Sequence, residues 1–242
     1  MIKSNESIDY IGDELDLFKK ALNWKNYFSK KISKSVHGDI LEVGAGIGVN
    51  TKFLARNPEK ISSWTLIEPD EKLAIQIKDN ISKVNVDNKR IINGTINTVL
   101  DKRFDTIIYI DVLEHIKESK KEIALAKQCL KPNGHLIILV PAYNFLFNTF
   151  DKKIGHYRRY DKKMLLKDIN SELSVVNLFY LDSVGFFASL INKVILKKEL
   201  PSLANISLWD NYMIPLSKIS DKLFFNSFGK SLIGVFRNDQ YK

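Results

Sequence analysis

The sequence predicts a single α/β domain, in which a mostly parallel sheet of seven strands is covered by helices on both faces. Two observations lead to this prediction. From residue 39 onward, short apolar runs alternate with amphipathic stretches of helical periodicity. These runs are continuously apolar, so the strands are expected to be buried on both faces, as in a parallel sheet between two layers of helices.

An N-terminal segment, residues 1–36, precedes the first expected strand. Its apolar positions between residues 12 and 35 fall on roughly one helical face, which predicts one or two helices. These positions are Leu15, Phe18, Leu22, Tyr27, Phe28 and Ile32. We therefore expect a helical cap in front of the sheet.

The central segment, residues 37–142, holds five of the seven expected strands. They are Ile40–Val43, Trp64–Ile67, Arg90–Ile92, Thr106–Ile110 and Leu136–Val140. Helical stripes of apolar residues lie between them, one at residues 73–81 and one at residues 123–130. The turn sequence Lys131-Pro132-Asn133-Gly134 is expected to end the second helix and to lead into a strand at His135–Val140.

The C-terminal segment, residues 143–242, is expected to form the acceptor side of the domain. The pattern predicts a helix at Lys162–Ile169, a strand at Ser174–Tyr180 and a last strand at Ser231–Arg237. Residues 184–228 contain two expected helices and a loop, and we interpret them as an insertion before the last strand. No repeat or linker marks a second domain, so residues 1–242 are taken as one unit.

Composition limits the class of protein. With 242 residues, 45% of them hydrophobic and 27% charged, the chain has the composition of a soluble globular protein. A single cysteine, Cys129, excludes an intrachain disulfide and a four-cysteine zinc site, and we expect it to be a small buried helix residue. The first ten residues have no apolar core, and the apolar segment 184–196 is shorter than the ~20 residues of a membrane span. We therefore predict a cytoplasmic protein.

Glycines after the first expected strand mark a candidate binding turn. The sequence Asp39-Ile-Leu-Glu-Val-Gly-Ala-Gly-Ile-Gly48 combines a strand with a sharp turn that lets a ligand approach the backbone closely. Its spacing is G-x-G-x-G, and Val49 leaves the dinucleotide fingerprint G-x-G-x-x-G incomplete. Glu42 precedes the glycines, and Glu68 ends the next strand, where a carboxylate can accept hydrogen bonds from ribose hydroxyls.

Three stretches, LEVGAGIG, TLIEPD and FDTIIYIDVLEHI, resemble motifs of class I S-adenosylmethionine-dependent methyltransferases. The resemblance covers roughly residues 36–142 and implies a Rossmann-like seven-stranded sheet with S-adenosylmethionine as cofactor. It implies that Gly44, Ala45 and Gly46 approach the methionine moiety, that Glu42 holds its amino group, and that Glu68 binds the ribose. The adenine would lie beside Pro69, Asp70, Gly94 and Thr95, and the methionine end beside Asp111. Many relatives have an acid where this chain has Thr95.

Simpler explanations stand beside several of these residues. The glycine turn could only cap a helix, and Glu68 could be an exposed acid at a strand end. Glu114 could cap the helix that follows it, and His115 could be a packing residue. The four histidines include no HExxH helix and no spacing to acids that is typical of a metal site, so no metal is predicted.

An aromatic and basic segment, residues 141–163, follows the fifth expected strand, where open α/β sheets place their ligands. A solvated basic loop is the plain alternative. His156 has the pKa range of a general base, and the paired Arg158 and Arg159 suit an anionic group of the acceptor. Tyr160, or its neighbour Tyr157, could position the acceptor. The pattern PAYN…GHYRRY resembles a bacterial and archaeal methyltransferase subfamily of poorly defined acceptor, often encoded beside surface-polysaccharide genes.

The predicted function is methyl transfer to an oxygen or nitrogen of a small-molecule, glycan or lipid-linked acceptor. An RNA methyltransferase is an alternative, because the net charge of +9 favours an anionic partner, although a Lys-rich solvated surface explains the charge as well. No appended RNA-binding module, catalytic cysteine or N/D-P-P-Y motif supports it, and no DNA partner is predicted. A cofactor-binding protein without transfer is the second alternative. Residues 184–196 with Lys197 and Lys198 raise a third hypothesis, peripheral contact with the inner membrane surface.

Overall fold

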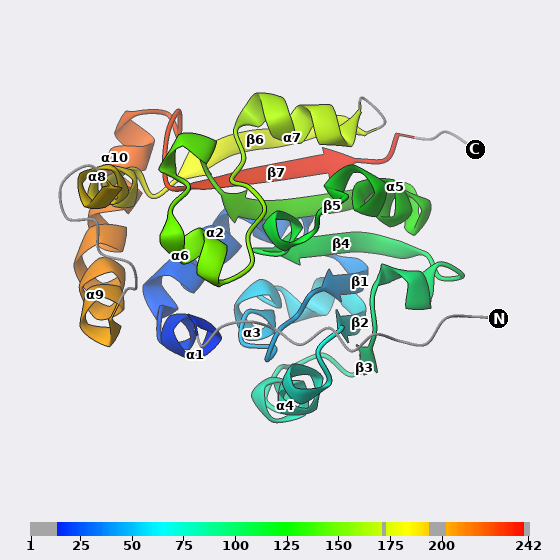
Figure 1. Cartoon of the computed structure of the whole chain (residues 1–242). Helices are drawn as coiled ribbons and strands as arrows, with labels where there is room; N and C mark the ends of the chain where they lie inside the picture. Colours follow the sequence, from blue (N-terminus) through cyan, green and yellow to red (C-terminus); the bar gives the residue numbers. More distant parts are fainter. Residues whose placement is uncertain (1–13, 171–172, 194–201, 240–242) are drawn as a thin grey trace.

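A computed structural model describes residues 14–170, 173–193 and 202–239 (Figure 1). Its centre is a seven-stranded sheet in the order β3-β2-β1-β4-β5-β7-β6. All neighbouring strands are parallel except β7, which runs antiparallel to both β5 and β6. This topology confirms the predicted fold class. The strands are β1 (Gly38–Val43), β2 (Ile61–Glu68), β3 (Lys89–Asn93), β4 (Phe104–Ile110), β5 (Leu130–Pro141), β6 (Ser174–Leu181) and β7 (Ser231–Arg237).

Helices cover both faces of the sheet (Figure 1). One core cluster joins the N-terminal helices and the C-terminal insertion to one face, and a second cluster packs α5 and α7 on the other. The α-helices are α1 (Glu14–Lys19), α2 (Leu22–Ile32), α3 (Thr51–Leu54), α4 (Glu71–Ile81), α5 (Ser119–Gln128), α6 (Thr149–Lys153), α7 (Lys162–Ile169), α8 (Ser183–Ile191), α9 (Leu203–Leu208) and α10 (Ile214–Leu223). Short 3₁₀ turns include Ile96–Val99, Leu113–His115 and Asn144–Leu146.

The start of β5 differs from the expectation. The strand begins at Leu130, and the residues of the expected turn lie within it, so the prediction of a strand start at His135 was wrong. The helix before it ends at Gln128, and buried Cys129 follows as its C-cap. Asn133 has φ 60°, and the register with β4 shifts between Phe104 and Thr106. The turn residues therefore form an irregularity inside the strand, because Asn tolerates the left-handed conformation.

The insertion between β6 and β7 contains the two expected helices. The second is continuous from residue 203 to residue 223, because α9 passes through a π-helical turn, Trp209–Met213, into α10. Pro215 lies directly after the π-helical turn, in the first turn of α10. In the described parts of the chain, we find no helix with the length and apolar character required to cross a bilayer. Lys197 and Lys198, which the membrane hypothesis invoked, lie outside the described residues.

Two buried aspartates fix the insertion to the sheet. Asp182, directly after β6, accepts hydrogen bonds from Trp209 Nε1 (2.8 Å) and Ser217 Oγ (2.7 Å). Asp221 of α10 accepts from the backbone N–H groups of Asp182 and Ser183, both at 2.8 Å. Because β6 is parallel to β5, this junction lies at the same edge of the sheet as the carboxyl ends of β1, β2, β4 and β5.

Candidate active site

The glycine turn after β1 depends on residues without a side chain. Gly44, Gly46 and Gly48 have φ values of 63°, 56° and 76°, which other residues rarely adopt. A Cβ on Gly44 would come within 2.7 Å of Val112 Cγ2. A Cβ on Gly46 would lie 3.6 Å from the Leu15 side chain, so α1 packs directly over the turn. The turn therefore lies against the Val112 side chain and beneath an N-terminal helix.

Glu68, at the end of β2, ties this turn to the start of α4. Its Oε2 accepts the backbone N–H of Gly46 at 2.8 Å, and its Oε1 accepts that of Asp70 at 3.0 Å. Burial raises the pKa of Glu68 above its ordinary value, although these two hydrogen bonds favour the ionised form and oppose the rise. Asp70 caps α4 by accepting from Leu73 N at 3.1 Å. Glu68 is therefore a buried acid inside the turn, and the alternative of an exposed strand-end acid was wrong.

The other residues expected at the adenine lie beside Glu68. The Asn93 side chain donates to the carbonyl oxygens of Glu68 (2.9 Å) and Pro69 (3.0 Å). The backbone N–H of Gly94 donates to the Glu68 carbonyl at 3.0 Å, and Thr95 follows at the start of a 3₁₀ turn. The structure thus brings these residues together at one edge of the sheet, while their contact with adenine stays a prediction.

Glu42 lies deeper, below the glycine turn. Its Oε2 accepts hydrogen bonds from Thr51 Oγ1 (2.8 Å) and Trp64 Nε1 (2.9 Å). Burial raises the pKa of Glu42 to about 7, although both bonds oppose the rise. Glu42 therefore fixes α3 to β2, and its expected contact with the amino group of the methionine moiety stays a prediction.

Asp111 follows β4 in a left-handed conformation with φ 55°, and its N–H donates to the Leu139 carbonyl at 2.9 Å. Loss of hydration at the carboxyl raises the pKa of Asp111 to about 6, and the neighbouring His156 and Lys25 oppose this rise. The residue as a whole is exposed. Lys25, on the mostly apolar buried face of α2, is itself buried, and burial lowers its pKa to about 8. Lys25 was not among the site residues expected from sequence. The one feature that could have indicated it is its position beside the aromatic residues of the same helix.

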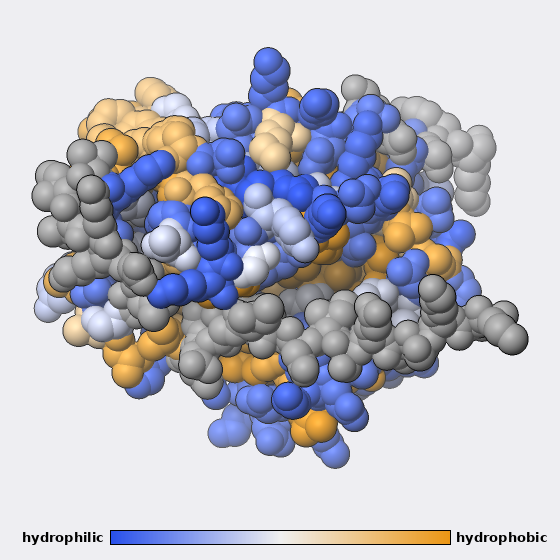
Figure 2. Space-filling view, viewed as in Figure 1, coloured by the Kyte–Doolittle hydropathy of each residue, from blue (hydrophilic) through white to orange (hydrophobic). Residues whose placement is uncertain are grey.

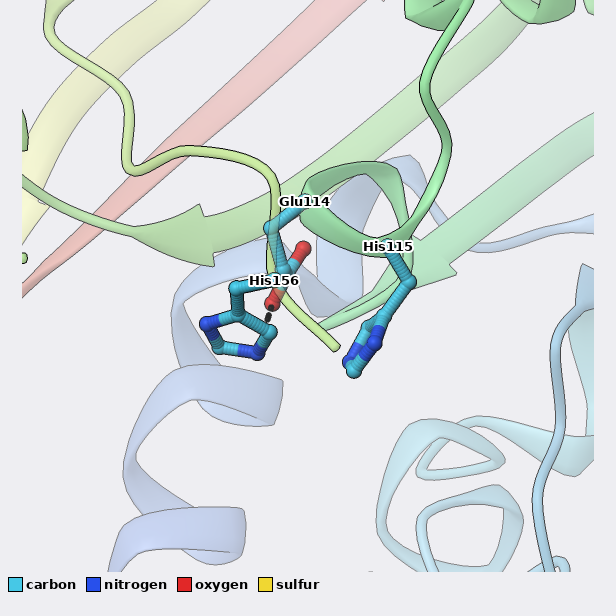
Figure 3. Close-up of side chains that lie close together, drawn as sticks. All are labelled: Glu114, His115 and His156. Carbon is cyan, nitrogen blue, oxygen red and sulfur yellow. Dashed lines mark ion pairs between the residues drawn. The ribbon is translucent and has the colours of Figure 1, made fainter. Parts of the chain in front are cut away.

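The acceptor-side segment brings a histidine to the same place (Figure 3). His156 Nδ1 lies 2.9 Å from Asp151 Oδ1, and its Nε2 lies 3.8 Å from Glu114 Oε1. The rings of His115 and His156 meet edge to face, with centroids 4.5 Å apart. Glu114, His115 and His156 offer ligand atoms within 4.8 Å of one another. Spacing in the sequence did not indicate this group, because the fold brings His156 beside two residues about 40 positions earlier in the chain. The expectation that the site holds no metal stays a prediction.

Protonation differs among these groups. Burial favours neutral Asp151, but its bonds to His156 and Arg159 prevail and lower the pKa of Asp151 below its ordinary value. Burial and nearby Asp111 raise the pKa of Glu114 well above its usual range. Burial, assisted by His156, lowers the pKa of His115 to about 3. At neutral pH we therefore infer an ionised Asp151, a neutral Glu114 and a neutral His115.

The neighbours of His156 in sequence have partners within the protein. Arg159 is buried and binds Asp151 through Nε and Nη2, both at 2.9 Å. Arg158 donates to Ser119 Oγ and to the Lys117 carbonyl, both at 2.6 Å. Tyr160 is fully buried in the core. These contacts favour positioning roles for Arg158, Arg159 and Tyr160 over direct contact with the acceptor.

A sheet of this order, with a glycine turn after β1 and an acid at the end of β2, defines the class I methyltransferase fold. A family model described as a methyltransferase domain matches residues 14–182. The chain therefore belongs to the methyltransferase-domain family.

Two curated relatives match part of the chain. The demethylmenaquinone methyltransferase of Tropheryma whipplei is 23% identical over 121 residues, which cover 50% of this chain and 49% of the relative. The mitochondrial ubiquinone biosynthesis O-methyltransferase of Dictyostelium discoideum is 26% identical over 149 residues, covering 57% and 45%. The chain thus spans about half the length of the curated relatives it matches.

Solved structures resemble the whole domain. The N-methyltransferase NodS from Bradyrhizobium japonicum, in complex with S-adenosylhomocysteine, aligns with a TM-score of 0.59 and 15% identity, over 97% of this chain and 95% of that one. A methyltransferase in complex with the Haloferax volcanii Trm112 activator aligns with a TM-score of 0.64 and 11% identity, over 94% and 95%. At these identities the likeness concerns the fold.

The residues present fit S-adenosylmethionine, the cofactor that this family implies. Glycine backbone without Cβ atoms suits close approach of a ligand, and the acids at the edge suit its hydroxyl and ammonium groups. Gly44 and Gly46 would face the methionine moiety, with Glu42 at its amino group. Glu68 would bind the ribose, and Asp111 would lie at the methionine end; these contacts stay predictions. Asp151 was not among the site residues expected from sequence. It lies in the segment FNTFDKK, whose basic and aromatic residues give no signal that would mark this acid.

Proposed function

We propose that the chain transfers the methyl group of S-adenosylmethionine to an oxygen or nitrogen of a small or lipid-linked acceptor, with His156 as general base. The observation that supports this most is the Asp151–His156 pair, whose Nδ1···Oδ1 distance is 2.9 Å. His156 is also near enough to Asp111, on the cofactor side, to lower the pKa of that carboxyl against its burial. A base therefore stands beside the residues that would hold the methionine end.

The chemistry of the pair follows from its protonation. An ionised carboxylate only accepts hydrogen bonds, so Nδ1 carries the hydrogen in the bond to Asp151. This leaves the lone pair on Nε2, and the 3.8 Å gap to Glu114 is too long for a hydrogen bond. Nε2 can therefore take the proton of the acceptor, while Asp151 holds the ring and stabilises the resulting imidazolium.

The remaining residues position and shield the reactants. S-adenosylmethionine, when bound, supplies a methyl group on a positively charged sulfur. The chain itself needs to hold the nucleophile in line and to exclude water. Leu15 of α1 packs on Gly46 and shields the turn. Arg159 fixes the carboxylate of Asp151 by donating to both of its oxygens.

Aromatic side chains beside the site favour an acceptor with an apolar or aromatic part. Tyr143, two residues after β5, stacks on Tyr180 with ring centroids 4.9 Å apart. It also contacts Phe145 (5.2 Å) and Phe186 (5.3 Å). Such a wall suits the ring or isoprenoid of a quinone-like molecule, the class named for the curated relatives, as well as a lipid-linked glycan.

The decisive experiment supplies labelled cofactor together with separate pools of lipid, glycan, small-molecule and RNA extract. We expect label in the lipid or small-molecule pool. His156→Ala should lower the rate by about 10²–10⁴-fold while binding cofactor as the parent does. His37→Ala, which changes a histidine at the amino end of β1, is the matched control and should stay active. Label only in RNA, or a fully active His156→Ala variant, would contradict the proposal.

Removal of metal ions with a chelator distinguishes His156 as a general base from the same residue as a metal ligand. A general base predicts that turnover is unchanged after EDTA treatment. Loss of turnover that a divalent cation restores would reassign Glu114, His115 and His156 as metal ligands.

A further inference from the structure

The continuous helix at residues 203–223 exposes apolar side chains along one face. Five of them recur at spacings of three or four residues and are between 51% and 70% exposed: Leu208, Tyr212, Leu216, Ile219 and Leu223. The opposite face is buried and packs on the core through Ile206, Trp209, Ile214, Ser217 and Asp221. We call the five exposed residues the apolar stripe. Within the described part of the chain, no element covers this second, apolar side of the helix.

The end of α10 adds an aromatic ring to this surface. Phe225 is 91% exposed and has φ 53°, and Asn226 follows with φ 54°. A bulky residue rarely adopts this conformation. Hydrogen bonds hold the loop in place, since Asn226 donates to the carbonyls of Asp221 (2.7 Å) and Tyr180 (3.2 Å). Phe225 thus has a strained backbone conformation and a solvent-exposed phenyl ring, and this combination suggests that the ring contacts a partner.

Helix α8 extends the same surface. Phe187 and Ile191 are each 51% exposed, and Phe187 contacts Phe228 with ring centroids 5.6 Å apart. Phe224, next to Phe225, contacts Phe228 as well, at 5.2 Å. Figure 2 shows apolar surface gathered over α8 and α10. Helices α8 and α10 therefore present one patch.

The described residues of the two segments that form this patch expose positive charges alone. Among the described residues of segments 183–193 and 202–230, the only acids are Asp210 and Asp221, and both are buried. Lys193 and Lys222 are exposed. A helix that pairs with a second copy of itself usually has charges of both signs beside its apolar seam. Apolar side chains flanked by lysines alone suit an anionic bilayer instead.

We propose that the apolar stripe, with Phe225 as a wedge, docks the protein on the surface of a membrane that contains anionic lipid. The apolar side chains would lie at the level of the headgroups, and the lysines would contact lipid phosphates. The domain lies on the bilayer and does not cross it.

The docked orientation bears on the acceptor, and this step rests on the proposed function. Contacting rings connect the patch to the site, from Phe187 through Phe186 (5.4 Å) to Tyr143 (5.3 Å). Tyr143 follows β5, at the edge of the sheet where the proposed cofactor site lies. A lipid-linked acceptor could therefore remain in the bilayer while its head reaches His156.

Sedimentation with vesicles tests the docking without any assay of activity. The full chain should bind phosphatidylcholine vesicles that contain phosphatidylglycerol, and binding should weaken with added salt and without the anionic lipid. The variant Leu216→Ser/Ile219→Ser/Leu223→Ser should bind these vesicles about tenfold more weakly or worse. Ile75→Ser, at an apolar position of α4 that is 70% exposed, is the matched control and should bind as the parent does.

Phe225→Gly separates docking from folding. Glycine relieves the strain of the left-handed conformation, so this variant should melt at or above the temperature of the parent and yet bind vesicles less. The docking proposal is overturned if the parent does not bind anionic vesicles, if the triple variant binds as the parent does, or if the stripe instead forms a dimer in solution. Vesicle binding without methyl transfer would count against the proposed function alone.

Discussion

Backbone strain gathers at the edge of the sheet that holds the candidate site. Asp111, Tyr143 and Asp182 have φ values of 55°, 63° and 67°, and they follow β4, β5 and β6. None is a glycine, so each conformation is held by its surroundings. Asp182, for example, is held by Asp221, Trp209 and Ser217. Strain at the carboxyl ends of three strands on one edge of the sheet is typical of residues that are placed for binding or chemistry.

Glu42 should make the stability of the cofactor-free protein depend on pH. Burial raises the pKa of Glu42 from 4.5 to about 7. Between these values the folded state keeps a proton that the unfolded state loses, so stability falls as pH rises through this window. Glu42→Gln keeps an oxygen that accepts from Thr51 and Trp64 but cannot ionise. At pH 8 we expect it to exceed the parent in stability by an amount on the order of 3 kcal/mol.

Thermal melts of parent and variant between pH 4.5 and pH 8 measure this difference. The two curves should converge near pH 4.5 and separate as pH rises. Curves that stay parallel over the whole range would show that Glu42 is not the source of the pH dependence.

The candidate site could be predicted only in part from sequence. The glycine turn and Glu68 are visible because their spacing around two strands reflects backbone geometry that the sequence must encode locally. Asp151 could not be recognised as a site residue from sequence. Its role depends on contacts with His156 and Arg159, which form only when the loop is folded. Paired arginines suggest an anion-binding site. The sequence alone does not show that Arg159 already forms an ion pair with a carboxylate of the protein, that of Asp151.

At the scale of elements, the sequence predicted α7 and β7 with the bounds that the structure has. Both have clear apolar periodicity and polar ends. The start of β5 was missed because Pro132, Asn133 and Gly134 are typical turn residues, and here they form an irregularity inside a strand. Local turn preference gave way to pairing with β4, which Phe104 and Leu130 begin.

Asp221 should control how the insertion docks on the rest of the domain. Besides two backbone N–H groups, it accepts the Tyr27 hydroxyl of α2 at 3.0 Å. Asp221→Ala would leave these buried donors unpaired, so we expect a loss of about 3 kcal/mol or more in the free energy of unfolding. Urea unfolding followed by circular dichroism measures it.

Lys222→Ala, at the exposed neighbouring position of α10, is the matched control and should change stability by less than about 0.5 kcal/mol. Asp221→Asn retains one acceptor oxygen and should fall between the two. Equal stability of Asp221→Ala and Lys222→Ala would mean that the insertion is held by its apolar contacts alone.

At the scale of the whole molecule, the cofactor site joins parts of the chain that are distant in sequence. Leu15 of α1 covers the turn at Gly46, and Glu68 links that turn to α4. Lys25 of α2 is near enough to Asp111 for the carboxylate to oppose the fall in the pKa of Lys25. A ligand held there would contact the N-terminal helices as well as the sheet. Binding should therefore stabilise the domain as a unit rather than one loop.

This predicts how the cofactor product S-adenosylhomocysteine affects unfolding. At 100 times its dissociation constant, a ligand that binds only the folded state adds about 2.7 kcal/mol to the free energy of unfolding. Glu68→Ala should lose most of this gain, because the carboxylate that fixes Gly46 and would accept the ribose hydroxyls is gone. Comparing each protein with its own ligand-free form removes the direct effect of the substitution on stability.

Glu59→Ala changes an exposed acid just before β2 and is the matched control, which should keep the full gain. NAD should stabilise neither protein, because Val49 leaves the dinucleotide fingerprint incomplete. If S-adenosylhomocysteine stabilised Glu68→Ala as much as the parent, the ligand would bind elsewhere, and the glycine turn would only connect β1 to α3. If it stabilised neither, the chain would keep the methyltransferase fold without its cofactor site, and the proposed transfer reaction would lose its methyl donor.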